Sequence, residues 1–306
     1  MASNIKPKIV VAGNGTIDTF VEGRVFIDGT RVTVKSDWGR AEFSVEDPNI
    51  RLGKKPRVNE NLETIVNASG LLHRYAPGGG GINSLTAISE LQGASDYTGE
   101  RVDLVYLDVS NPNPLVMEGL RRLGFVESFH FWRRDMPTNV VLKYEDDRII
   151  LKGHELRRQS PFDTDGERVK PYIEGSRALL INGAKDSQYV ELWMQIAQQY
   201  KVPVLSAITP SLPWSFVYET ILPNSEVVVL NYEDLAESRG LKTAHDLDSK
   251  TLSQAYMAHA LETLEEIRSK NPEKDVYITL GSNGVYCSSK EGIFQVTLNQ
   301  DYVGRV

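Results

Sequence analysis

Cysteine is nearly absent from this sequence: Cys287 is the single one among 306 residues. No disulfide can therefore form within the chain, and such cysteine usage is typical of a reducing compartment. No apolar run approaches the roughly 20 residues needed to cross a bilayer, and no signal-peptide pattern follows Met1. These absences exclude a disulfide-stapled fold, and we expect a cytoplasmic protein without a membrane partner.

Basic charge is also scarce. Lys and Arg number 34 against 41 Asp and Glu, which gives a net charge of −7 and a pI of about 5.4. A nucleic-acid-binding protein usually has a clustered basic face, whereas the densest basic run here, Arg51 to Arg57, is interrupted by Gly and Pro. We therefore expect no nucleic-acid partner.

Several catalytic motifs are missing as well. The sequence has no phosphate-binding P-loop pattern, no nucleophile-elbow pattern of a hydrolase, and no histidines at the spacing of metal ligands. The segment Gly13-Asn14-Gly15 follows a predicted strand, as in a dinucleotide-binding fingerprint, but Asp18 occupies the third glycine position. The hypothesis of a nicotinamide-dependent oxidoreductase consequently rests on Gly13 and Gly15 alone.

What is present is an alternation of short apolar runs and amphipathic segments. Runs that are apolar on both faces and are joined by helices predict a central parallel sheet covered on both sides. Hydrophobic residues make up 41% of the chain, enough for one large α/β domain over residues 1–306. The main predicted strands are residues 9–12, 102–109, 125–131, 178–182, 202–207, 226–230 and 276–280, and the main helices are 83–91, 114–123, 187–200 and 249–269.

Two inserts, at about residues 21–75 and 139–151, interrupt this alternation. The first contains a β-hairpin signal with Asp28-Gly29 as its turn, and the second has an acidic turn at residues 145–147. We expect the inserts to form one small β-sheet that acts as a lid over a ligand cleft. Plain surface elaboration is the alternative interpretation.

Two motifs place polar groups and glycines where a small molecule could bind. Asn14 and Asp18 follow the first strand, and open parallel sheets bind ligands beyond the carboxyl ends of their strands. An Asp there can accept hydrogen bonds from a diol, although a turn or helix cap explains it equally well. Gly78 and Gly79 begin a run of four glycines before the helix that carries Asn83. Ordered glycines are costly unless the backbone must approach something closely, but a flexible linker is the alternative.

Two further motifs suit a nucleotide. Asn231 and Asp234 lie where a strand gives way to a helix, so local capping explains much of them. The functional interpretation places this amide and acid near phosphates and a hydrated cation. Thr279, Gly281 and Gly284 follow another strand; the hydroxyl can donate to a phosphate oxygen, and the glycines allow a tight turn. In isolation, a plain turn into a hairpin would explain these three.

Taken together and in this order, the four motifs resemble the PfkB family of ribokinase-like sugar kinases. The spacing of Gly78, Gly79 and Asn83 resembles the family's N-terminal signature. Asn14 and Asp18 are most similar to the substrate-binding opening of adenosine kinases. The resemblance spans nearly the whole chain, with Asn231 and Asp234 similar to the family's Asn-x-x-Glu motif, and with residues 279–284 similar to its nucleotide loop.

The resemblance implies a Rossmann-like αβα sandwich with a β-sheet lid, and transfer of the γ-phosphoryl group of ATP to a hydroxymethyl group of a sugar or nucleoside. It implies that Asp18 holds substrate hydroxyls with help from Asn14 and Asn83, and that the backbone passes close to the sugar at the two glycines. It also implies that the nucleotide site is lined by Thr279, Gly281 and Gly284, with Asn231 and Asp234 facing phosphates and Mg²⁺. Lid sheets of this family often pair between subunits, which implies a homodimer.

Two departures from the family pattern qualify these expectations. Asp234 is one methylene shorter than the usual Glu. The C-terminal Gly-Ala-Gly-Asp signature, which supplies the catalytic base, is absent, so we assign no catalytic residue here, expect the base beyond Val306, and expect this chain to have little activity. A non-catalytic sugar- or nucleotide-binding protein on the same scaffold is the alternative. Which sugar or nucleoside is the acceptor stays open.

Overall fold

The computed structural model describes residues 7–46, 56–58, 60–111, 113–123, 126–144, 147–153, 165–209, 212–240 and 249–297. The chain divides into two compact units. Unit 1 comprises Met1–Gly13, Gly99–Val105 and Asp163–Val306, and unit 2 comprises Asn14–Thr98 and Tyr106–Phe162.

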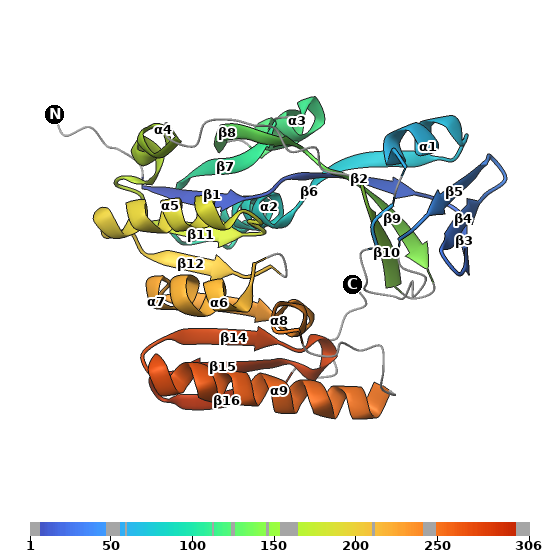
Figure 1. The fold of residues 1–306 in the computed structure, drawn as a ribbon. Helices are drawn as coiled ribbons and strands as arrows, with labels where there is room; N and C mark the ends of the chain where they lie inside the picture. Colours follow the sequence, from blue (N-terminus) through green and yellow to red (C-terminus); the bar gives the residue numbers. More distant parts are fainter. Residues whose placement is uncertain are drawn as a thin grey trace. The chain divides into compact units, whose positions relative to one another are not determined.

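The larger sheet has nine strands in the order β16-β15-β14-β13-β12-β11-β1-β7-β8. The strands from β1 to β14 in unit 1 pair in parallel, and β15 and β16 are added antiparallel. From β11 to β16 the strands follow one another in chain order, and Figure 1 shows β11, β12, β14, β15 and β16 in this succession. The strands are β1 (Lys8–Gly13), β7 (Asp103–Asn111), β8 (Val126–Asp135), β11 (Ala178–Asn182), β12 (Val204–Ala207), β13 (Val227–Asn231), β14 (Asp275–Thr279), β15 (Val285–Ser289) and β16 (Gly292–Val296).

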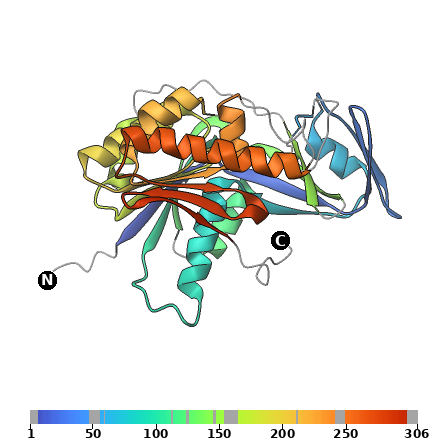
Figure 2. The same cartoon turned by 90° about the horizontal axis from the view of Figure 1, so that it is seen from below.

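Helices flank this sheet, and its first strand, β1, is apolar and buried on both faces, as the sequence predicts. Val10 and Val11 are consecutive in β1 and both are fully buried, so neither face of the strand meets water. Figure 2 shows α9 lying over the strands at the C-terminal edge and running along them, and Arg268 of this helix donates to the carbonyl of Ser289 at 2.8 Å. The helical segments of unit 1 are α4 (Asp165–Ile173), α5 (Ser187–Gln199), α6 (Trp214–Phe216), the π-helix Val217–Ile221, α7 (Leu222–Asn224), α8 (Tyr232–Ser238), α9 (Ser249–Lys270) and the 3₁₀ turn Gly281–Asn283. The predicted α/β class is confirmed.

Unit 2 holds two further sheets. A four-stranded sheet has the order β10-β9-β2-β6, and a three-stranded sheet has the order β3-β4-β5. The strands are β2 (Thr16–Val21), β3 (Arg24–Asp28), β4 (Arg31–Lys35), β5 (Arg40–Ser44), β6 (His73–Gly78), β9 (Thr138–Tyr144) and β10 (Asp147–Lys152), and the helices are α1 (Leu62–Ala68), α2 (Gly80–Gly93) and α3 (Pro114–Arg122).

The inserts therefore form two sheets, whereas we expected one. Both sheets are apolar on one face, and these faces share a core with α1 in which Phe43, Leu142 and Ile149 are fully buried. The predicted hairpin at Asp28-Gly29 is present, with Gly29 at a φ of 57° between β3 and β4. Residues 145–146 of the second predicted turn lie outside the described residues, as do residues 298–306.

No helix in the described ranges combines the length and the apolar character needed to span a bilayer.

Candidate acceptor and nucleotide sites

Asp18 is the centre of a polar cluster in unit 2. It lies in β2, and the register of the four-stranded sheet sets it opposite Ala76 of β6 and Asn139 of β9. Its Oδ1 atom accepts a hydrogen bond from the Thr16 hydroxyl at 3.0 Å and another from the Asn139 amide at 2.9 Å. Two donors therefore fix the orientation of this half-buried carboxylate.

Gly78 and Gly79 form the corner between β6 and α2, and each lies where a side chain would not fit. A Cβ atom at position 78 would overlap the Asp18 carboxylate and would lie 2.8 Å from the Thr16 hydroxyl oxygen. Gly79 has a φ of 94°, and a Cβ atom there would overlap the carbonyl oxygen of Asn14. The glycines thus allow this corner to pack directly against the loop from β1 to β2. This close backbone approach explains why residues with a high entropic cost of ordering are used here.

Four of the five predicted acceptor residues come together in this way: Asn14, Asp18, Gly78 and Gly79. Asn14 is buried, with 3% of its surface exposed. Asn83 lies in the first turn of α2, where its backbone N–H donates to the Gly79 carbonyl at 2.9 Å, and its side chain is exposed. Its contact with an acceptor stays a prediction.

Asn139 is a residue of this cluster that the motifs did not reveal. It is 121 positions from Asp18 in the sequence, and only the parallel pairing of β9 with β2 brings the two together. An isolated Asn near the start of a predicted strand gives no signal of that pairing.

The predicted nucleotide residues lie at strand ends in unit 1. Asn231 is the last residue of β13 and Thr279 the last of β14, and the register makes them direct neighbours. Both face the carboxyl edge of the sheet, where open parallel sheets bind ligands. The Asn231 side chain is exposed, and Asp234 is half-buried in the first turn of α8.

The two glycines in the loop after β14 have different structural roles. Gly281 has a φ of 59°, and a Cβ atom there would meet nothing within 4 Å. Gly284 has a φ of 91°, and a Cβ atom there would overlap the carbonyl oxygen of Val296 in β16. Gly284 is therefore required by the hairpin itself, and its contact with a nucleotide stays a prediction. The backbone at Gly281 is open to a ligand.

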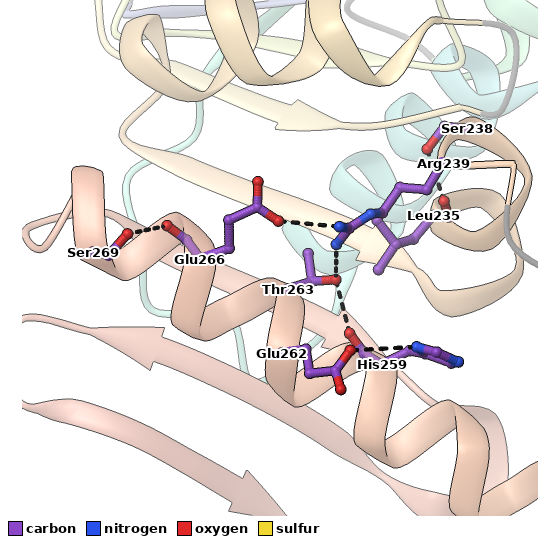
Figure 3. A network of polar contacts seen from close by, with 8 residues as sticks. All are labelled: Leu235, Ser238, Arg239, His259, Glu262, Thr263, Glu266 and Ser269. Carbon is purple, nitrogen blue, oxygen red and sulfur yellow. Dashed lines mark hydrogen bonds and ion pairs between the residues drawn. The ribbon is translucent and has the colours of Figure 1, made fainter.

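Contacts with α9 fix the helix that carries Asp234. The rings of Tyr232 in α8 and Tyr256 in α9 stack with centroids 3.8 Å apart; burial, and then the neighbouring Tyr256, raise the pKa of Tyr232 to about 12. Arg239, one residue beyond α8, donates to the Thr263 hydroxyl at 2.5 Å and to the Glu266 carboxylate at 3.1 Å (Figure 3). These contacts hold α8 against the long helix.

Asp234 is the predicted contact for a cation at this edge of the sheet. Within the described ranges, no three His, Cys, Asp or Glu side chains gather closely enough to hold a metal ion. Mg²⁺ in phosphoryl-transfer enzymes is commonly held by one or two carboxylates, with phosphates and waters completing its coordination. Asp234 can supply one such carboxylate.

Comparison with known proteins decides the family. The profile described as pfkB family carbohydrate kinase matches residues 133–300. The chain belongs to the PfkB family. The matched segment contains the residues predicted for a nucleotide site in this PfkB chain, whereas Asn14, Asp18, Gly78 and Gly79 precede it. No curated protein sequence matches the chain.

Solved structures show that this PfkB chain has the ribokinase-like fold. Ribokinase from Giardia lamblia has a TM-score of 0.59 at 15% identity, covering 96% of this chain and 76% of that one. Adenosine kinase from Anopheles gambiae in complex with a di(adenosine-5) tetraphosphate has a TM-score of 0.63 at 12% identity, with coverages of 95% and 83%. Phosphofructokinase-2 from Escherichia coli in complex with fructose-6-phosphate has a TM-score of 0.53 at 14% identity, with coverages of 97% and 80%.

Proposed function

We propose that this chain binds a sugar or nucleoside at Asp18 and serves ATP-dependent phosphoryl transfer to a hydroxymethyl group of that acceptor. The observation that carries the proposal is the Asp18 carboxylate, oriented by Thr16 and Asn139 beside a corner made of glycines, in a chain of the PfkB family.

Asp18 suits the recognition of vicinal hydroxyls. An ionised carboxylate has about four lone-pair sites, and Thr16 and Asn139 both use Oδ1. The Oδ2 atom can therefore accept a hydrogen bond from a hydroxyl of the sugar or nucleoside without disturbing the bonds that orient the side chain. Hydrogen bonds to charged groups are the stronger class, so this contact should dominate the affinity for the acceptor.

ATP as the phosphoryl donor is supported by the family and by a neighbour of the same fold that holds an adenosine polyphosphate. In the proposal, the Thr279 hydroxyl and the open backbone at Gly281 contact the nucleotide, and Asn231 and Asp234 face its phosphates and the accompanying Mg²⁺. Catalysis of phosphoryl transfer is largely positioning and charge stabilisation, which is the work that these groups can do.

In this proposal Asp18 is not the catalytic base. Asp18 already accepts two hydrogen bonds, and its proposed task is to hold other hydroxyls of the acceptor. A base must instead lie within hydrogen-bond reach of the hydroxyl that is phosphorylated.

Pairing of two chains through the inserts is a further part of the proposal. Phe26 in β3 and Trp38 in the turn before β5 are 52% and 69% exposed, and large exposed apolar side chains are common at such contacts. Light scattering of the wild type and of Trp38→Ser tests this: the mass should be that of a dimer for the wild type and should shift toward a monomer for the variant.

Calorimetric titration tests the proposal. Ribose, fructose, fructose-6-phosphate, adenosine and an aminoimidazole nucleoside are titrated with and without Mg²⁺ and a non-hydrolysable ATP analogue. Asp18→Ala should abolish acceptor binding and spare nucleotide binding, while Asp28→Ala, an exposed carboxylate of the same unit, is the matched control. ADP formation that requires the bound acceptor distinguishes a kinase from a non-catalytic binding protein, and failure of every acceptor to bind would refute the proposal.

A further inference from the structure

A second carboxylate lies beneath the acceptor cluster, and no motif contains it. Asp108 in β7 is fully buried. Its Oδ2 atom accepts from the backbone N–H of Gly15 and from the Tyr106 hydroxyl, both at 2.9 Å, and its Oδ1 atom accepts from the backbone N–H of Ser110 at 2.8 Å. All of these residues belong to unit 2.

The surroundings of Asp108 are neutral donors. Burial raises the pKa of Tyr106 well above its ordinary value, and the Asp108 charge raises it further. The phenol therefore stays protonated and donates a hydrogen bond to Asp108. The ring of His130 lies edge-on to Tyr106 at a centroid distance of 6.0 Å. Burial lowers the pKa of His130, and the Asp108 charge opposes that effect only in part. The buried carboxylate is thus stabilised by oriented N–H and O–H dipoles.

The bond to Gly15 connects Asp108 to the acceptor cluster. Gly15 lies between Asn14, whose carbonyl packs against Gly79, and the strand that carries Asp18. The packing is tight, since a Cβ atom at position 15 would lie 2.8 Å from the Asp108 Oδ2 atom and 2.8 Å from the Met136 methyl. The Asp108 carboxylate therefore sets the position of the Gly15 peptide relative to β7.

Stability alone does not account for an acid in this place. Burying a carboxylate costs desolvation, and an apolar residue of similar volume often stabilises a core at least as well. Unlike an apolar side chain, a carboxylate in this place accepts a hydrogen bond and so fixes the direction of the Gly15 N–H group. We propose that Asp108 is a positioning residue of the acceptor site, acting through the Gly15 peptide. This inference rests on the proposed acceptor function of Asp18.

Two variants perturb this contact from opposite sides. In Asp108→Asn, the side-chain amide has only one oxygen. Its NH₂ group must therefore face either the Ser110 N–H or the Gly15 N–H, and two donors that face each other cannot form a hydrogen bond. Gly15→Ala keeps the carboxylate but inserts a methyl group between it and the loop. Ser110→Ala is the control, because it alters a fully buried side chain of the same strand and retains the N–H that Asp108 uses.

The readouts are acceptor and ATP-analogue affinities by calorimetry and the hydrogen-exchange rate of the Gly15 amide by NMR. We expect Asp108→Asn and Gly15→Ala to weaken acceptor binding roughly ten- to a hundredfold, the range of a hydrogen bond to a charged group. ATP-analogue affinity should not change, and Gly15 should exchange faster in Asp108→Asn. Ser110→Ala should match the wild type in all three measurements.

Unchanged acceptor affinity in the folded variants would overturn the inference, as would an equal loss of acceptor and nucleotide affinity. If Asp108→Asn does not fold, Gly15→Ala alone decides. If the wild type binds no acceptor, the proposed function fails. The Gly15 exchange rate then still decides whether Asp108 holds the loop, and an unchanged rate in Asp108→Asn would count against it.

Discussion

Gly78→Ala gives the most direct test of how the acceptor cluster is built. The new methyl group would occupy the space of the Asp18 carboxylate and lie 2.8 Å from the Thr16 hydroxyl oxygen. Because the overlap involves both neighbours, the Asp18 side chain must turn away. It then loses its hydrogen bonds to Thr16 and Asn139.

The magnitude follows from those two bonds. A hydrogen bond to a charged group contributes about 1.5–3 kcal/mol. Asp18 is half-buried, so water replaces part of what is lost, and the lower end of the range applies. We therefore expect the free energy of unfolding to fall by roughly 3 kcal/mol, and acceptor affinity to fall with the displaced carboxylate.

The assay is urea denaturation with acceptor calorimetry, and Gly93→Ala is the matched control. Gly93 ends α2, and a Cβ atom there would meet nothing within 4 Å, so this variant should be as stable as the wild type or slightly more stable. A double-mutant cycle adds the mechanism: in an Asp18→Ala background, Gly78→Ala should cost less than in the wild type, because the carboxylate is gone and only the more distant Thr16 hydroxyl still obstructs the methyl group. Wild-type acceptor affinity in Gly78→Ala, or additive effects in the cycle, would refute the reasoning.

Four further outcomes are expected. Gly79→Ala should destabilise the protein by about 1–3 kcal/mol in denaturation, because its φ of 94° is unfavourable for other residues; a neutral effect would contradict this. The lowered pKa of His130 stabilises the fold above the unfolded pKa of about 6.5, and this contribution is lost as the pH falls toward the lower folded value, so His130→Gln should flatten the stability curve below that pH. Asp234→Ala should weaken binding of the Mg²⁺–ATP analogue more than Asp234→Glu does, and equal affinities in calorimetry would remove Asp234 from the site. Amides of β3 to β5 should exchange faster than those of β14 and should slow when acceptor binds; ligand-independent exchange as slow as that of β14 would argue against a lid.

The sequence predicts the parts of the fold that depend on local pattern. The strand at residues 178–182 and the helix that follows it are found within a residue of their predicted bounds, because the run is apolar on both faces and Asp186 caps the helix. The helix predicted from Asn83 instead begins at Gly80. Glycine has a poor helix propensity, so the run of glycines predicts a loop. In the structure the glycines are needed for the tight corner at Gly79, and the helix starts directly after that corner.

What the sequence does not predict depends on pairing across long separations. The division of the inserts into two sheets follows from the parallel pairing of β2 with β9, and no local signal specifies that pairing. The bonds from Asn139 to Asp18 and from Gly15 to Asp108 span 121 and 93 positions. Asp108 does leave a trace, because it is an acid that follows the apolar run of residues 104–107 within one strand, and such a residue needs donors from elsewhere in the fold.

Titration of the acceptor panel into wild type, Asp18→Ala and Asp28→Ala, with Mg²⁺ and the ATP analogue present, tests the central claim most directly. We expect one class of sugar or nucleoside to bind to the wild type and to Asp28→Ala with the same affinity. That acceptor should show no measurable binding to Asp18→Ala, which still binds the nucleotide. Acceptor binding that survives in Asp18→Ala, or no binding of any acceptor to the wild type, would contradict it.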